Sequence, residues 1–157
     1  MSRRRRLRTR PAWWLGLAQA VVMLPTVKLL LRARGYRRTR AILERTSRPG
    51  RPGGAGEAVP APVAVLTSSV GTVAAWDPLR SRCLARSLTL WWLARRRGHE
   101  VELLMGVAPP SAGSLPAHAW VEYAGVPVND TPDVRTRYAP LPFPHDLGAE
   151  ANPDRPG

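Results

Sequence analysis

Cysteine is nearly absent from this sequence of 157 residues, in which Cys83 is the only one. A single thiol cannot close an internal disulfide, which excludes disulfide-stapled scaffolds and leads us to expect a reducing, cytoplasmic location. A chain of this length can bury one hydrophobic core without such staples. We therefore expect one compact domain with a small appendage.

Acidic residues are scarce in the N-terminal third. Residues 1–51 carry 14 arginines and Lys28 against Glu44 alone, whereas residues 52–157 carry nine basic and ten acidic side chains. The isoelectric point near 11.6 therefore belongs to this third. Such a segment could bind anionic lipid, nucleic acid or an acidic protein partner, or it could form a solvated basic helical face.

A long uninterrupted apolar run is also missing. The run that begins at Ala12 is interrupted by Pro25 and Lys28 and closed by Arg32, which predicts that it is too short to span a membrane. The arginines before it and residues 18–20 resemble a signal peptide and its cleavage site, but cleavage there would leave a very short apolar region. We expect an amphipathic helix, buried on the domain or lying on a membrane surface, with secretion as the minor alternative.

Helical periodicity predicts a helix over residues 12–34, kinked at Pro25 and ended by Gly35, and a second short helix over 36–45. The two form a basic helical hairpin that either packs on the core or docks a partner. Trp14, Leu17, Val21 and Leu24 are expected to form one apolar stripe on the first helix.

The composition divides the chain into four segments. Residues 1–46 are the basic helical appendage, and residues 47–62 are a linker with four prolines and four glycines, which oppose regular structure. Residues 63–147 form the main domain, and residues 148–157 form a flexible tail.

Within the main domain, two helices precede three strands. A helix is expected over 82–97, whereas residues 63–76 fit either a helix or a strand, with the helix favoured. The strands are expected over 101–107, 117–122 and 126–130. Helices followed by antiparallel strands predict an α+β fold.

Cys83 lies in the first turn of the predicted helix over 82–97, with Ser81 as the N-cap. Unpaired backbone N–H groups and the positive end of the helix dipole favour a thiolate over a thiol there. Arg80 and Arg82 add positive potential. A lone cysteine is usually a small buried hydrophobe, so its place on the helix is what favours reactivity.

His118 and Asp130 are expected to face each other across a β-hairpin. Residues 123–125 predict a three-residue loop with glycine in the left-handed region, which sets Glu122 opposite Val126. In that register His118 lies opposite Asp130 on one sheet face, with Cβ atoms about 5 Å apart. A two-residue loop would shift the register by one and put the two side chains on opposite faces.

A thiol, an imidazole and a carboxylate are the parts of a cysteine nucleophile, its base and its orienting acid. Asp133 is the alternative carboxylate, and the register argument favours Asp130 over it. His99 and His145 are expected to be solvated, and Ser87 to line the site or to pack. The sequence has no Cys/His cluster and no phosphate-binding glycine loop, so neither a metal nor another cofactor is expected.

Three blocks of sequence, in this order, carry a family resemblance: residues 83–98 (CLARSLTLWWLARRRG), 117–122 (AHAWVE) and 129–140 (NDTPDVRTRYAP). They resemble the leader peptidases of lasso-peptide biosynthesis, which belong to the transglutaminase-like group of papain-type folds. The resemblance covers about half of the chain, and the basic N-terminal helices are similar in character to those of the family.

The resemblance implies a transglutaminase-like core in which the nucleophile helix packs on a small antiparallel sheet. It implies a cysteine peptidase that removes the leader from a ribosomally made lasso-peptide precursor, with Cys83 as nucleophile, His118 as base and Asp130 as orienting partner. In this family the stand-alone peptidase works with a small leader-recognition protein and an ATP-using lasso cyclase.

Two other functions fit the same residues. The same fold could pass the acyl group to an amine, as a transglutaminase or amidase does. Alternatively, a non-enzymatic protein could bind nucleic acid or lipid through residues 1–51, with salt-sensitive affinity and an unreactive Cys83. For the peptidase we expect no specific nucleic acid, but the basic helices could hold it peripherally on a membrane.

Overall fold

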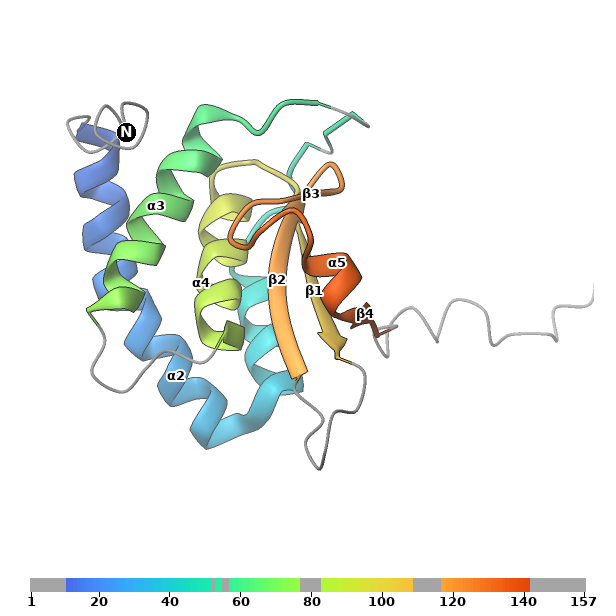
Figure 1. Cartoon of the computed structure of the whole chain (residues 1–157). Helices are drawn as coiled ribbons and strands as arrows, with labels where there is room; N and C mark the ends of the chain where they lie inside the picture. The colour runs from blue at the N-terminus through green and yellow to red at the C-terminus, as the bar shows by residue number, and fades with distance from the viewer. Residues whose placement is uncertain (1–10, 52, 55–56, 77–82, 109–116, 142–157) are drawn as a thin grey trace, which may run out of the picture.

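The computed structural model describes residues 11–51, 53–54, 57–76, 83–108 and 117–141. Three long helices, α2 (Pro11–Arg45), α3 (Ala61–Ala75) and α4 (Cys83–Arg96), precede a four-stranded antiparallel sheet. Its strands are β1 (Glu102–Val107), β2 (Ala117–Tyr123), β3 (Val126–Pro127) and β4 (Ala139–Pro140), in the order β3-β2-β1-β4. The short helix α5 (Val134–Arg137) lies on the sheet side away from the long helices (Figure 1). The α+β expectation is confirmed.

Helix α4 is the centre of the packing, because it contacts α2, α3 and the two long strands. Its residues from Ala85 to Ala94 are buried apart from Arg86 and Trp92, which makes it apolar almost all round. Gly98, with φ 79°, ends the helix in the left-handed region, as the sequence predicts. The predicted cap Ser81 lies outside the described residues.

Helix α2 consists of two helical halves joined at Gly35, whose φ of 69° and ψ of 176° break the helix. The predicted stop at Gly35 is therefore confirmed, whereas Pro25, where a kink is predicted, keeps helical dihedral angles. Figure 1 shows the first half beside α3 and the second half returning behind α4. Of the two roles expected for these helices, packing on the core is the one observed, since Leu24, Val27 and Leu43 join the core.

The four side chains expected to form one apolar stripe do not share a face of α2, because Leu24 is buried whereas Trp14 and Val21 are exposed. Trp14 and Val21 are 62% and 55% exposed, and Gly16 and Ala20 are buried in their place. Small residues let α2 approach α3 closely, and a Cβ built on Gly16 would lie only 2.9 Å from Ser69 Oγ. The expectation of one stripe is wrong because it considered only large hydrophobic side chains. The close packing of α2 on α3 requires small residues at the contact.

Gly16 provides a stability prediction with a matched control. Gly16→Ala is expected to destabilise the protein by about 1–3 kcal/mol, because Ser69 Oγ is held by the carbonyls of Trp13 and Val65 and cannot easily move. Gly71, inside α3, has open space around its Cβ position. Gly71→Ala should stabilise by roughly 0.5–1 kcal/mol through helix propensity. Urea denaturation measures both, and equal effects would contradict the close-packing argument.

The segment 47–62 contains no helix or strand among its described residues before α3 begins at Ala61. It is attached to the main domain all the same, since Arg51 forms a parallel bridge with His99 and the Gly50 N–H donates to Glu100 Oε2 at 2.7 Å. The division of the chain at this segment stays a prediction.

Candidate active site

Cys83 is the first residue of α4 that the structure describes, and its thiol is free and half-buried. One turn further along, Ser87 donates a hydrogen bond of 2.8 Å to the carbonyl of Ala119 on β2. Helix α4 and strand β2 start at the same end of the molecule and run side by side (Figure 1). Cys83 therefore lies towards the start of β2, which is the end that carries His118.

His118 shares one face of β2 with Trp120 and Glu122, because side chains alternate along a strand. Its pairing partner on β1 is Gly106. A Cβ at Gly106 would lie 2.8 Å from the Ala139 carbonyl oxygen and 3.0 Å from side-chain atoms of Trp120 and Tyr138. The glycine thus makes room for the aromatic rings that flank the histidine.

Tyr138 fixes the plane of the His118 ring, because the two rings stack with centroids 4.7 Å apart and an interplanar angle of 28°. Trp120 lies nearly parallel to the imidazole at 6.2 Å. Only 18% of the His118 side chain is exposed. Sequence analysis missed Tyr138, since nothing in its spacing from the histidine relates the two.

Asp130 binds one ring nitrogen of His118. His118 Nε2 and Asp130 Oδ2 are 2.5 Å apart. The other oxygen, Oδ1, accepts the backbone N–H of Thr131 at 2.8 Å and the guanidinium of Arg137 at 2.9 Å. Nδ1 is then the ring nitrogen not bonded to Asp130. Asp133 is not the carboxylate beside His118: its side chain is 59% exposed and pairs with Arg137.

The environment of Asp130 keeps it ionised. Partial burial raises its pKa, but the hydrogen bonds from His118, Thr131 and Arg137, together with the positive charge of the imidazole, outweigh burial and hold the pKa below its ordinary value. The carboxylate is therefore a permanent acceptor for His118 at neutral pH.

The hairpin register predicted from sequence is wrong, although the contact it was meant to explain is present. The loop has two residues, Ala124 and Gly125, with φ of 49° and 79°, so Tyr123 pairs with Val126 and Glu122 with Pro127. This is the geometry of a type I′ turn, which matches the twist of the strands. Continued in that register, β3 would have turned Asp130 away from His118.

Asp130 reaches the histidine because the chain leaves the sheet early. The last backbone bond of this ladder runs from Val128 N–H to the Val121 carbonyl at 2.9 Å. At the next position the side-chain oxygen of Asn129 accepts the Val121 N–H at 2.8 Å, in place of a backbone carbonyl. The strand expected over 126–130 therefore ends at Pro127, and Asp130 is free to turn back to His118.

Asn129 also ties this segment to the nucleophile helix. Its Nδ2 donates to Ser87 Oγ at 2.9 Å, and its carbonyl accepts the Arg86 guanidinium at 2.9 Å. Ser87 is buried, so of the two roles expected for it packing is the one observed. One network therefore sets the position of α4 relative to β2 and Asp130. Sequence analysis missed Asn129, whose only signal was its place beside Asp130.

A second network holds the segment after Asp130. Arg135 of α5 binds the fully buried Glu122 with two nitrogens, at 2.8 and 2.5 Å, and Trp120 Nε1 donates to the same carboxylate at 2.7 Å. This bidentate pair fastens α5, and with it Tyr138, over the outer face of the sheet.

Arg135→Ala is expected to lower the free energy of unfolding by about 2 kcal/mol, because it leaves the buried Glu122 carboxylate with Trp120 as its remaining partner. Arg45→Ala, at the exposed end of α2, should change stability by less than about 0.5 kcal/mol. Thermal unfolding of both variants tests this. A loss no larger than that of the control would contradict the role given to the pair.

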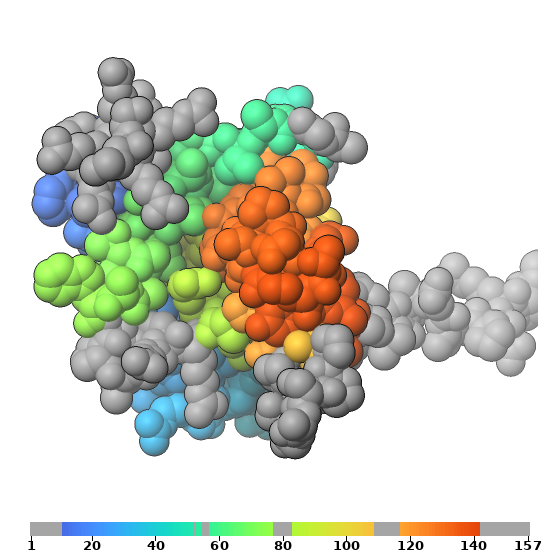
Figure 2. Space-filling view, viewed as in Figure 1, coloured from blue at the N-terminus to red at the C-terminus, as the bar shows by residue number. Residues whose placement is uncertain are grey.

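A groove of about 800 Å³ runs between α3 and residues 127–131, with Arg86 and Asp130 in its wall. Figure 2 shows the start of α4, in yellow-green, at the floor between green α3 and the orange segment that follows β2. The rest of the lining mixes polar residues such as Ser68 and Thr72 of α3 with apolar ones such as Leu90. Such a groove fits an extended chain with polar backbone groups.

The remaining predicted residues lie elsewhere or outside the described chain. His99 is half-buried at the opposite end of α4 from Cys83, and His145 is not among the described residues. Among the residues that the structure describes, the Cys83 thiol makes no hydrogen bond with the His118 ring. The same part of the chain holds no group of three potential metal ligands.

Comparison with known proteins gives one family. Residues 20–142 match the model of the transglutaminase-like superfamily, a group that includes cysteine peptidases and acyl transferases. No curated protein and no solved structure matches the chain. The match begins inside α2 and ends after β4, so it covers the helices and the sheet described above. The chain belongs to the transglutaminase-like superfamily.

Proposed function

We propose that this protein is a cysteine peptidase that removes the leader peptide from a ribosomally synthesised lasso-peptide precursor, with Cys83 as nucleophile, His118 as base and Asp130 as the orienting carboxylate. The observation that carries the proposal is the hydrogen bond of 2.5 Å between His118 Nε2 and Asp130 Oδ2. It lies near the start of β2, at the same end of the molecule as the start of α4. A base held in this way on one nitrogen presents the other nitrogen for proton transfer.

The proposed reaction is acyl transfer to water in two steps. The Cys83 sulfur attacks the carbonyl carbon at the leader–core junction, His118 takes the thiol proton, and the C–N bond breaks as His118 gives that proton to the leaving amine. Water then attacks the thioester, transfers a proton to His118 and releases the leader as a carboxylate, with the thiol restored. The backbone N–H of Cys83 is a candidate oxyanion donor.

The groove between α3 and residues 127–131 supports a peptide substrate, because it leads past Arg86 to Asp130. Arg86 lies one helical turn beyond Cys83 on α4. A segment lying in this groove would approach the nucleophile from the α3 side.

On this proposal the chain acts with a small leader-recognition protein and a lasso cyclase. The test is incubation of the chain with its neighbouring-encoded precursor peptide and leader-recognition protein, followed by mass spectrometry. A leader fragment and a core fragment whose masses sum to that of the precursor plus one water are expected. An intact precursor under conditions in which the partner binds the leader would overturn the proposal.

Membership of the transglutaminase-like superfamily favours one alternative, transfer of the acyl group to an amine. The same experiment separates the two, because an amine acceptor adds its own mass to the acyl product in place of water. Adding glycine methyl ester as acceptor and finding it in most of the product would favour a transglutaminase or amidase.

A further inference from the structure

The outward face of α2 is apolar and uncovered along its first half. Five of the eight large apolar side chains that are exposed among the described residues lie there, each 55–68% exposed: Trp14, Leu15, Val21, Val22 and Leu29. Single exposed apolar residues are ordinary, but a contiguous patch marks a surface that binds something.

These residues follow the helical period. Positions 14, 18, 21, 25 and 29 are three or four residues apart and all exposed, whereas Gly16, Ala20 and Leu24 on the other side pack on the core. The helix therefore has two apolar faces, one towards the core and one towards solvent. The outer stripe, from Trp14 to Leu29, is about 22 Å long at 1.5 Å per residue.

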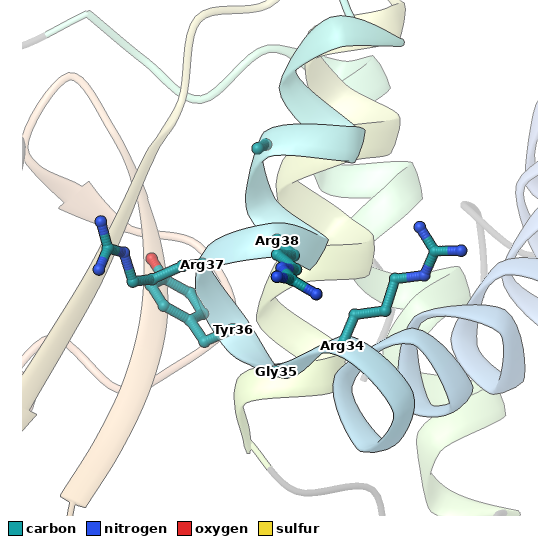
Figure 3. A pocket seen from close by; sticks show the side chains of 6 residues that line it. Arg34, Gly35, Tyr36, Arg37 and Arg38 are labelled. Atoms are coloured by element: carbon teal, nitrogen blue, oxygen red, sulfur yellow. The ribbon is translucent and has the colours of Figure 1, made fainter.

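Positive charge continues this stripe. Arg32 is seven residues after Pro25, so it lies on the same helical face, and it is exposed. Arg34, Arg37 and Arg38 then surround the bend at Gly35, where they line a hollow of about 610 Å³ (Figure 3). Figure 3 shows their side chains pointing in different directions, and all three are exposed. The first acidic residue of the sequence is Glu44.

We propose that the outer face of α2 binds the surface of a membrane rich in anionic lipid. The apolar stripe enters the boundary between headgroups and acyl chains, and the arginines at the bend bind lipid phosphates. Charge complementarity argues for this partner, since the face combines an apolar stripe with a cationic end and carries no acidic side chain.

Helix α2 lies on the membrane in this proposal and does not cross it. By length and composition alone α2 could cross a bilayer, whereas the sequence pattern predicts an apolar run too short to do so. However, Gly16 packs on Ser69, Ser69 donates to the Trp13 carbonyl, and Arg97 donates to Gln19 at 2.7 Å. Insertion across the bilayer would break all three contacts.

The test is cosedimentation of the full chain with vesicles of phosphatidylcholine, with and without 30% phosphatidylglycerol. Binding is expected with phosphatidylglycerol and not without it. Val21→Gln/Leu29→Gln should weaken it by about 10-fold or more through lost apolar contact. Arg34→Gln/Arg37→Gln/Arg38→Gln should weaken it by roughly 100-fold, at about five-fold for each arginine.

Leu141→Gln is the matched control, an equally simple change at a side chain that is 44% exposed beside the sheet, and it should bind like the wild type. Circular dichroism checks that each variant is folded. If both sets of α2 variants bound vesicles as tightly as the wild type, another surface of the protein would be the one that binds lipid, and the proposal would be overturned. So would a dimer in gel filtration that Val21→Gln/Leu29→Gln dissociates, with no binding to vesicles. Cys83→Ala should bind vesicles normally, which keeps this test independent of peptidase activity.

Discussion

Cys83→Ala is expected to abolish leader removal while the protein stays folded. Loss of a nucleophile from a working triad lowers kcat by several orders of magnitude, here at least about 1,000-fold. The Cys83 side chain is half-buried at the start of α4, so its truncation to a methyl group removes little packing. Cleavage of the precursor, followed by mass spectrometry at matched enzyme concentration, measures the loss.

His118→Ala and His99→Ala provide the matched controls for this experiment. Both are half-buried histidines, but only His118 contacts Asp130. We expect His118→Ala to be as inactive as Cys83→Ala, and the double variant to lose no more than either one, because the two groups act as a unit. His99→Ala should cleave within about three-fold of the wild type. Cleavage retained by Cys83→Ala would exclude the proposed mechanism.

Labelling gives a readout that does not need the natural substrate. A peptide electrophile directed at thiols should add one mass increment to the wild type and none to Cys83→Ala, since Cys83 is the only cysteine. His118→Ala should react more slowly, because it lacks the base that takes the thiol proton. Equal rates would favour the non-enzymatic alternative, in which the cysteine is incidental.

Sequence could predict the elements of this fold because each has a strong local signal. The helix over 82–97 combines an apolar pattern with Gly98 as a stop, and it is observed as Cys83–Arg96. The strands over 101–107 and 117–122 alternate and are observed within one residue. The strand over 126–130 ends early, because an Asn129 side chain takes over one of its hydrogen bonds. The replacement of a backbone acceptor by a side-chain oxygen leaves no periodic pattern in the sequence, so it cannot be predicted from one.

The contact between His118 and Asp130 was predicted from a loop that does not exist. The sequence predicts a type I turn followed by Gly125 in the left-handed region, whereas Ala124 also adopts a positive φ, which favours glycine or asparagine. The pairing of the two side chains depends instead on the path of residues 128–131 after the strand. The residues that fix this path, Asn129 and Arg137, are tertiary partners far from the loop. The catalytic roles of the three site residues stay a prediction.

Asp130→Ala is expected to lower kcat/KM for leader removal by about 100-fold or more, whereas Asp133→Ala should remain within about three-fold of the wild type. The two carboxylates are three residues apart and both contact Arg137, but only Asp130 contacts His118. Without Asp130 the imidazole loses its fixed orientation and the negative charge that stabilises its protonated form. If both variants lost the same activity, the loss would come from the contacts with Arg137 that the two carboxylates share, and not from the bond between Asp130 and His118.

The pH dependence of stability gives this prediction a second measurement. Despite the opposing effect of burial, the hydrogen bonds of Asp130 hold its folded-state pKa below its unfolded value. A carboxyl with a lowered folded pKa stabilises the protein above its unfolded pKa, and this stabilisation is lost as the pH falls through the folded pKa. The wild type should therefore be more stable than Asp130→Ala at about pH 5, and the difference should shrink as the pH falls below about 4. Urea denaturation at a series of pH values measures it, and a difference that grows from about pH 5 towards lower pH would show that the carboxylate is not held in this way.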